Sequence, residues 1–250
     1  SYRVVEYLVN YGRGLNLTYG VKDAILCHNG ENFTDNDLKP SLKPNNLKKI
    51  KTRDFMPTSY EGCIVRLSDK IAYLGRDIED AIKANFITRK DIPQTIKPHI
   101  GHCDSEINSH IIQMLTLNVI DFSKDKDSIG FSQQIHKLAV EIGKFNYRNI
   151  YNHTILVDYG KHIDNIISTL FEYFMVLFKK SGYDYKAYKS SSSTIDVGFG
   201  KYMESMRKIY EDKNENPLVI ITDYISGMTD SFAFACMENV SLPSPIKFRI

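Results

Sequence analysis

The chain has 250 residues, of which 42% are hydrophobic and 25% charged, a balance typical of soluble globular domains. Its formal net charge of +2 singles out neither nucleic acid nor a membrane as partner. The four cysteines are widely spaced and form no CxxC pair, which argues against a disulfide framework and favours a reducing, cytoplasmic location. The most apolar run, 166–178, contains Glu172 and is shorter than the roughly 20 residues that span a bilayer.

Two short helices and a long loop are predicted first. Apolar residues at helical spacing near the start predict a helix that ends at Gly12 and Gly14, because glycine adopts the left-handed C-cap conformation. The chain starts without methionine inside this helix, so we expect a fragment or a processed product. A second helix is predicted over 19–28, and 29–57 reads as a solvated loop with one short helical turn. Its basic run 48–51 leaves open a contact with phosphate or single-stranded nucleic acid.

Helical periodicity continues through the rest of the chain. Thr58 and Glu61 have capping-box spacing and predict a helix to about Ala84, and Asp104 or Ser105 is expected to cap the next one. Further helices are predicted over 105–122, 132–151, 155–180, 198–211 and 217–239. We expect a flexible connector over 186–194, where serines cluster, and a short extended tail over 246–250. Without a strand ladder or repeat, the sequence predicts an all-α fold.

The predicted helix that begins near Thr58 carries the most informative pattern. Asp69, Tyr73 and Asp77 follow one another at intervals of four residues. At about 100° per residue they stay within an arc of about 80°, so one helix edge presents carboxylate, phenol and carboxylate in a row. Lys70 lies beside this row. Hard-metal and phosphate chemistry both need carboxylates near positive side chains, so the row is a candidate site, although each residue alone is compatible with an ordinary amphipathic helix.

Three ordered sequence blocks resemble the family of HD-domain deoxyguanosine triphosphate triphosphohydrolases. The segment 58–81 is similar to the family's last motif, an Asp-Glu/Lys-Ile-Ala-Tyr block followed by Asp-x-x-Asp-Ala. Residues 14–18 resemble its GLNLT block, and 223–230 resemble its DYIAGMTD block. The segment 145–151 also looks like its FLY-x-x-x-Y segment. The resemblance implies an HD-domain-like helical bundle, a deoxynucleoside triphosphate as substrate, and deoxynucleoside plus inorganic tripolyphosphate as products.

The resemblance also implies roles for individual residues. Asp69 looks like the final aspartate of the family's H…HD…D site for a divalent metal ion, Mg²⁺ or Mn²⁺. Tyr73 and Asp77 look like the pair that contacts the sugar, with Asp77 accepting from the 3′-hydroxyl. Lys70 looks like a phosphate contact and Lys144 is a weaker candidate for the same role. Tyr151 resembles a tyrosine that lines the nucleotide pocket. For the 223–230 block, a buried helix anchor is favoured over a ligand.

One departure from the family pattern bears on activity. The family's first His, its His-Asp doublet and its catalytic acid or base are expected upstream of residue 1, and no His-Asp dipeptide occurs in the chain. One aspartate cannot hold a catalytic divalent ion by itself. We therefore expect a C-terminal fragment in which 1–84 is the rest of an HD-type catalytic core and 85–250 a helical region packed on it. The intact protein is expected to be an enzyme and this chain alone inactive.

Several alternatives remain open at this stage. A zinc site could involve His99, His102 and Cys103, with Asp104, Glu106 and His110 nearby, although no second paired motif exists. The tyrosine-rich segments between 147 and 185 could stack on bases, although core packing is the default. The chain could be a non-catalytic helical module that binds nucleotides, nucleic acid or a partner. It could also act on another phosphate ester. By resemblance we expect a homo-oligomer, and we expect no membrane partner.

Overall fold

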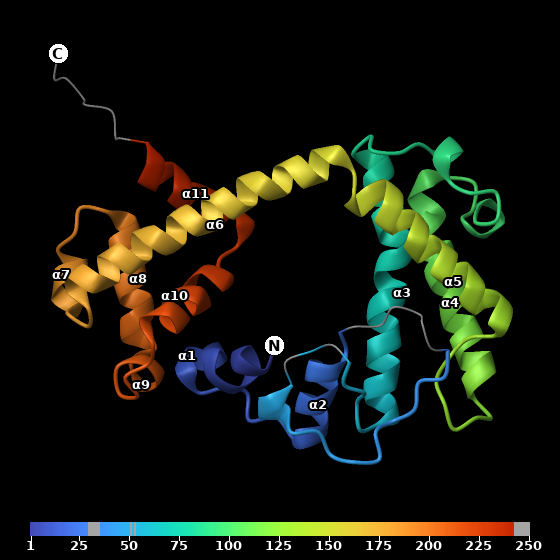
Figure 1. The fold of residues 1–250 in the computed structure, drawn as a ribbon, viewed down its shortest axis with the longest axis horizontal. Coiled ribbons are helices and arrows are strands. Elements are labelled where there is room, and N and C mark those ends of the chain that lie inside the picture. The colour runs from blue at the N-terminus through green and yellow to red at the C-terminus, as the bar shows by residue number, and fades with distance from the viewer. Residues whose placement is uncertain (30–35, 51, 53, 243–250) are drawn as a thin grey trace. The chain divides into compact units, whose positions relative to one another are not determined.

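The computed structural model describes residues 1–29, 36–50, 52 and 54–242 (Figure 1). Across these residues the chain is helical, and its one extended pairing is an isolated antiparallel bridge between Leu38 and Ile129. The all-α class predicted from the sequence is confirmed. No helix in this part of the chain is long and apolar enough to cross a membrane. The extended tail predicted over 246–250 lies outside the described residues.

The chain divides into two compact units. The first contains residues 1–2 and 17–157, and the second contains 3–16 and 158–250. The compact units therefore differ from the expected parts 1–84 and 85–250, because helices that follow residue 84 pack against helices that precede it. The assignment of 1–84 to an HD-type catalytic core stays a prediction.

The first unit is built around one long helix. Its α-helices are α2 (Tyr19–Cys27), α3 (Tyr60–Lys83), α4 (Ile107–Ser123) and α5 (Gln133–Asn146), and α5 continues into the π-helix η6 (Tyr147–Tyr151). Short 3-10 turns occur at Leu47–Lys49, Arg89–Asp91, Lys97–His99 and Asp104–Glu106. The apolar stripe of α3 contributes Ile71, Leu74 and Ile78 to a core shared with α4 and α5. At Gly75 an added Cβ would lie 2.8 Å from the Cα of Asn108, so glycine permits the close approach of α3 and α4.

The start of α3 is displaced by one residue from the predicted cap. Ser59, and not Thr58, is the N-cap, and its side chain accepts a hydrogen bond from the Gly62 amide. Thr58 instead donates through its backbone amide and its hydroxyl to the buried carboxylate of Asp23, at 2.6 and 2.8 Å. The Asn45 side-chain amide donates to the same carboxylate at 2.8 Å. These hydrogen bonds thus connect Asp23 of α2 to Asn45, in the described part of the 29–57 segment, and to Thr58.

The predicted cap of α4 is also wrong. Asp104 lies in a 3-10 turn before the helix and pairs with Arg89 at 3.0 Å. The helix begins at Ile107, and the backbone amide of Asn108 in its first turn donates to the carboxylate of Glu79 at 2.9 Å. Glu79 lies on α3 and is buried. The carboxylate of Glu79, on another helix, therefore accepts a hydrogen bond from the first turn of α4, where the sequence pattern predicted a local cap.

The second unit contains more helices than the sequence predicted. They are η1 (Val4–Leu8, a π-helix), α1 (Val9–Gly12), α6 (Thr154–Ser181), α7 (Tyr185–Lys189), α8 (Thr194–Ser205), α9 (Arg207–Tyr210), α10 (Pro217–Ser226) and α11 (Asp230–Ser241). The connector expected over 186–194 is therefore partly helical, because Asp184 caps α7 and Tyr188 is buried. The helix expected over 217–239 breaks after Ser226, where Thr229 caps α11.

Aromatic side chains fill the core of the second unit. The rings of Phe174, Phe199 and Tyr224 meet pairwise with centroids 5.0 Å apart. A partly buried ion pair joins the N-terminal segment to α10: the guanidinium of Arg3 donates to both carboxylate oxygens of Asp223, at 2.8 and 2.7 Å. The hydroxyl of Tyr210 donates to the same carboxylate at 3.1 Å. Asp223, in the block 223–230, is thus an anchor for the N-terminal segment.

Candidate functional site

A cavity of about 570 Å³ opens between α3 and the continuous helix formed by α5 and η6. Five of the six candidate site residues line it: Asp69, Lys70, Tyr73, Lys144 and Tyr151. The sixth, Asp77, accepts a hydrogen bond from the hydroxyl of Tyr151. The six residues selected from the sequence lie on two segments about 70 residues apart in the chain. The structure brings these two segments together. The individual roles of the six residues stay predictions.

The second wall of the cavity is the end of α5 and the π-helix η6. Lys144 lies on α5, and Tyr147, Arg148 and Tyr151 lie on η6 at spacings of three, four and seven residues from Lys144, so they share one helix face. π-Helical turns are rare and frequently occur at functional sites. The sequence analysis included Tyr147 only among the tyrosines that could stack on bases and did not single out Arg148, although this helical spacing could have indicated both.

Asn146 fixes the two walls to each other. Its side chain is buried and its amide donates to the carbonyl of Leu74 on α3 at 2.9 Å. Its carbonyl oxygen Oδ1 is buried with no hydrogen-bond partner among the described residues, and Asn146 lines the cavity. A buried acceptor without a partner costs free energy, so a bound molecule or a water that donates to Oδ1 would be stabilised there.

The cavity is positively charged overall. Lys70, Lys144 and Arg148 contribute three cations against one carboxylate, Asp69, among the described residues that line it. No ion pair to a described residue neutralises these three cations. A cavity with unpaired cations favours an anionic ligand.

Burial shifts the pKa values of both members of the Asp77–Tyr151 pair. Burial raises the pKa of the Asp77 carboxyl above its ordinary value of 3.8, while the hydrogen bond from Tyr151 opposes this rise. Burial and the same hydrogen bond raise the pKa of the Tyr151 hydroxyl, which therefore stays a donor at neutral pH. Because the folded chain holds the Asp77 proton more tightly than the unfolded chain does, this group's contribution to stability falls as pH rises from 3.8 through the raised pKa.

Removing the Tyr151 hydroxyl should raise the pKa of Asp77 further. We expect Tyr151→Phe to do so because the hydrogen bond that stabilises the carboxylate is lost. The measurement is a pH titration of the Asp77 side-chain carbon resonance by NMR. Tyr73→Phe is the matched control, since Tyr73 lines the same cavity but does not contribute to the shift, and should leave the titration unchanged. An unchanged or lowered pKa in Tyr151→Phe would contradict the assigned hydrogen bond.

Comparisons with known proteins identify relatives over nearly the whole chain. No protein-family model matches it. It is 28% identical to the deoxyguanosinetriphosphate triphosphohydrolase-like protein of Clostridium perfringens strain SM101, over 99% of the chain and 60% of that relative. Proteins of the same name are 28% identical in Caldanaerobacter subterraneus and 27% identical in Desulfatibacillum aliphaticivorans, over 98% of the chain in each case and 58% and 61% of those relatives.

The chain is thus similar over nearly its whole length to proteins named deoxyguanosinetriphosphate triphosphohydrolase-like. It spans about 60% of the length of these curated relatives, so the activity of the whole protein is a matter for proposal. Within the segment 145–151, Asn146 stands where the family's FLY-x-x-x-Y pattern has leucine. The cavity thus gains a buried polar acceptor at a position where the pattern is apolar.

The divalent metal ion that the family resemblance implies does not fit the residues of this chain alone. Asp69 is the one acidic side chain among the described residues that line the cavity. Among the described residues, no group of three or more His, Cys, Asp or Glu side chains could hold a metal ion. His99, His102 and Cys103 do not form such a group with one another. The ring of the nearby His110 contacts the backbone carbonyl of Glu106 at 2.9 Å instead.

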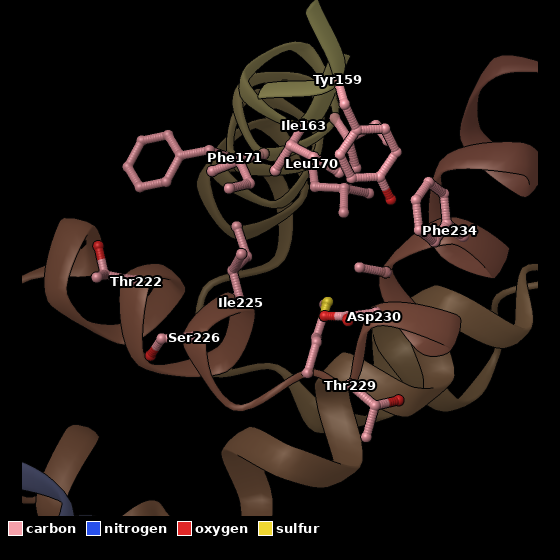
Figure 2. Close-up of a pocket in the computed structure, with 14 residues that line it drawn as sticks. Tyr159, Ile163, Leu170, Phe171, Thr222, Ile225, Ser226, Thr229, Asp230 and Phe234 are labelled. Atoms are coloured by element: carbon pink, nitrogen blue, oxygen red, sulfur yellow. The ribbon is translucent and has the colours of Figure 1, made fainter. Parts of the chain in front are cut away.

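The end of the family-like 223–230 block lines a second cavity, of about 480 Å³, within the second unit (Figure 2). Tyr159 and Leu170 of α6 face Ile225 of α10 and Phe234 of α11 across it, with Asp230 at its edge. This cavity is mostly apolar. The block therefore has two structural parts: Asp223 is buried against Arg3, and the residues from Ile225 onward form cavity wall.

Proposed function

We propose that the full-length protein containing this chain hydrolyses deoxynucleoside triphosphates to deoxynucleoside and inorganic tripolyphosphate. The observation that carries the proposal is the cavity between α3 and η6, which five residues selected by family resemblance line and whose Tyr151 bonds to the sixth, Asp77. The names of the similar proteins, deoxyguanosinetriphosphate triphosphohydrolase-like, support the same reaction. Water would attack the α-phosphorus, and the bond from this phosphorus to the 5′-oxygen of the sugar would break.

The chain's own residues would bind and orient the substrate. Lys70 and Lys144 would offset the charge of the triphosphate, since both line the cavity without a partner carboxylate. Asp77 would accept from the 3′-hydroxyl of the sugar, with Tyr151 holding its carboxylate in place. The exposed ring of Tyr73 would pack against C2′ and disfavour ribose, where a 2′-hydroxyl would collide with it.

Asp69 would supply one ligand to a divalent metal ion, Mg²⁺ or Mn²⁺. Such an ion stabilises charge on phosphate oxygens when bound, but it needs several oxygen or nitrogen ligands. The described residues offer one carboxylate in the cavity, so we propose that this chain alone binds nucleotide without turning it over. The family resemblance leads us to propose a homo-oligomer. The four unpaired cysteines lead us to propose a cytoplasmic location.

Product analysis tests the proposed function. The full-length protein and this chain are each incubated with the four deoxynucleoside triphosphates and Mg²⁺ or Mn²⁺, and products are separated by ion-exchange chromatography. Tripolyphosphate and deoxynucleoside from the full-length protein alone is the expected result. Release of monophosphate or pyrophosphate would indicate another phosphohydrolase reaction. Nucleotide binding without any product from the full-length protein would indicate a non-catalytic binding module.

A further inference from the structure

The apolar cavity of the second unit, between α6, α10 and α11, has no role in the proposed function. Asp230 is the one charged residue among the described residues that line it. The side chain of Asp230 points toward the space between Ile225 and Phe234 (Figure 2), and within the described part of the chain its carboxylate has no hydrogen bond or ion pair. An apolar cavity with one unpaired carboxylate favours an occupant that carries a cation beside apolar side chains.

The wall of this cavity is open to solvent on the side of α6 and α11. Tyr159 and Ile167 of α6 are 51% and 46% exposed, and Phe234 of α11 is 42% exposed. Large apolar side chains that line one cavity and remain in contact with water indicate a surface that another segment or molecule covers. The occupant should therefore bury apolar area as well as pair with the carboxylate.

The residues that follow α11 have the matching composition. Residues 246–250 read Ile-Lys-Phe-Arg-Ile, so apolar and basic side chains alternate. In an extended segment alternate side chains share one side, so the three apolar side chains can face the cavity together. The long basic side chains can then reach its edge. Pro243 and Pro245 separate this segment from α11 and cannot continue a helix, so the chain can change direction there.

The segment is also tethered close enough to reach the cavity. Phe234 precedes Leu242 by eight residues, which correspond to about 12 Å along a helix. Six residues of extended chain span up to about 20 Å, so Phe248 can return from Leu242 to the cavity. A short tether gives an effective concentration in the millimolar range, on the order of what weak binding needs. This tether favours the chain's own segment over a separate molecule.

We propose that residues 246–250 bind in the apolar cavity of their own chain, with Phe248 between α6 and α11 and a basic side chain paired with Asp230. The bound segment covers the exposed wall residues and neutralises the one carboxylate of the cavity. Its binding energy adds to the stability of the second unit, because docking connects the residues after α11 to α6. The proposal is independent of the reaction that the full-length protein catalyses.

Cysteine cross-linking tests the docking in the full-length protein. Cys103→Ser removes an exposed thiol, and Ile250→Cys is then combined with Ile167→Cys in the cavity wall. A short bis-maleimide reagent should join the two thiols within one chain, read as a product of monomer size on a denaturing gel and located by mass spectrometry of its peptides. Adding Asp230→Asn should slow cross-linking roughly twofold to fivefold, because it removes one member of an exposed ion pair.

Val176→Cys is the matched control for Ile167→Cys. Both residues are exposed and β-branched on α6, but Val176 does not line the cavity and lies nine residues further along, on the opposite face of the helix. Paired with Ile250→Cys, it should give about tenfold less cross-linked product. Adding Phe248→Ser should lower the Ile167→Cys yield to the level of this control, because the largest apolar side chain of the segment is lost.

Three results would overturn the proposal. Equal yields at the two positions of α6, or no product at either, would show that the segment does not occupy the cavity. An unchanged yield with Phe248→Ser would show that its apolar side chains do not hold it there. A product of dimer size, formed in place of the monomer-sized one, would assign the cavity to the segment of a second copy and exclude docking within one chain.

Discussion

Asp69→Asn in the full-length protein should lower the kcat for tripolyphosphate release by about 1,000-fold or more. Asparagine keeps the size of the side chain and removes the one negative charge among the described residues that line the cavity. Loss of a metal ligand removes several kcal/mol of transition-state stabilisation, which corresponds to a factor of this order. The measurement is the steady-state rate with Mn²⁺ and a saturating deoxynucleoside triphosphate, together with metal binding by isothermal calorimetry.

Asp80→Asn is the control for this experiment. Asp80 lies on the same helix, is half exposed and pairs with Arg76 outside the cavity, so its replacement should leave the rate within about twofold. A wild-type rate in Asp69→Asn would remove Asp69 from the site. A lower rate with unchanged metal affinity would retain a role for Asp69 but not as a ligand.

Asp223→Asn should lower the unfolding free energy of the second unit by about 2 kcal/mol. The carboxylate of Asp223 is 6% exposed and accepts hydrogen bonds from Nε and Nη2 of Arg3 and from the hydroxyl of Tyr210. Breaking a fully buried pair costs about 3–5 kcal/mol. The Arg3 side chain is 36% exposed, so solvent screens the pair and we expect less. Urea unfolding followed by amide hydrogen exchange in α10 measures the change.

Asp158→Asn provides the comparison for the stability measurement. Asp158 belongs to the same unit but pairs with Lys161 at 2.7 Å on the exposed surface of α6. An exposed pair of this kind contributes at most about 1 kcal/mol, so the variant should unfold at nearly the same urea concentration as the original protein. Equal stability of Asp223→Asn and the original chain would show that the N-terminal segment does not depend on the ion pair.

The helices were predictable where an apolar stripe is long and were less so where tertiary contacts set their ends. The periodicity of α3 located it to within two residues at each end, but the cap was assigned to Thr58. Thr58 bonds to Asp23, which lies 35 residues away and which no local pattern identifies. The helix α7 was missed because serine-rich composition outweighed the cap at Asp184 and the burial of Tyr188.

The part of the candidate site on α3 was predictable from helical spacing and from the family resemblance, whereas the part on η6 was less so. Helical spacing and the resemblance together indicated Asp69, Tyr73 and Asp77, because these residues share one helix edge. The second wall was only partly indicated: the FLY-x-x-x-Y pattern leaves the position of Arg148 unspecified. Arg148 joins the site only because Asn146 and Tyr151 dock η6 against α3. That docking is a tertiary contact, which composition and periodicity do not reveal.

The ion pair between Arg3 and Asp223 also has a consequence for synthesis on the ribosome. The two residues are 220 positions apart, and the second unit needs both, since it contains 3–16 as well as the residues from 158 onward. Nearly all of the first unit is contiguous, over 17–157, and leaves the ribosome before α10 is made. We therefore expect the first unit to fold during translation and the second to close only after α10 has emerged, because long-range contacts form late and slowly.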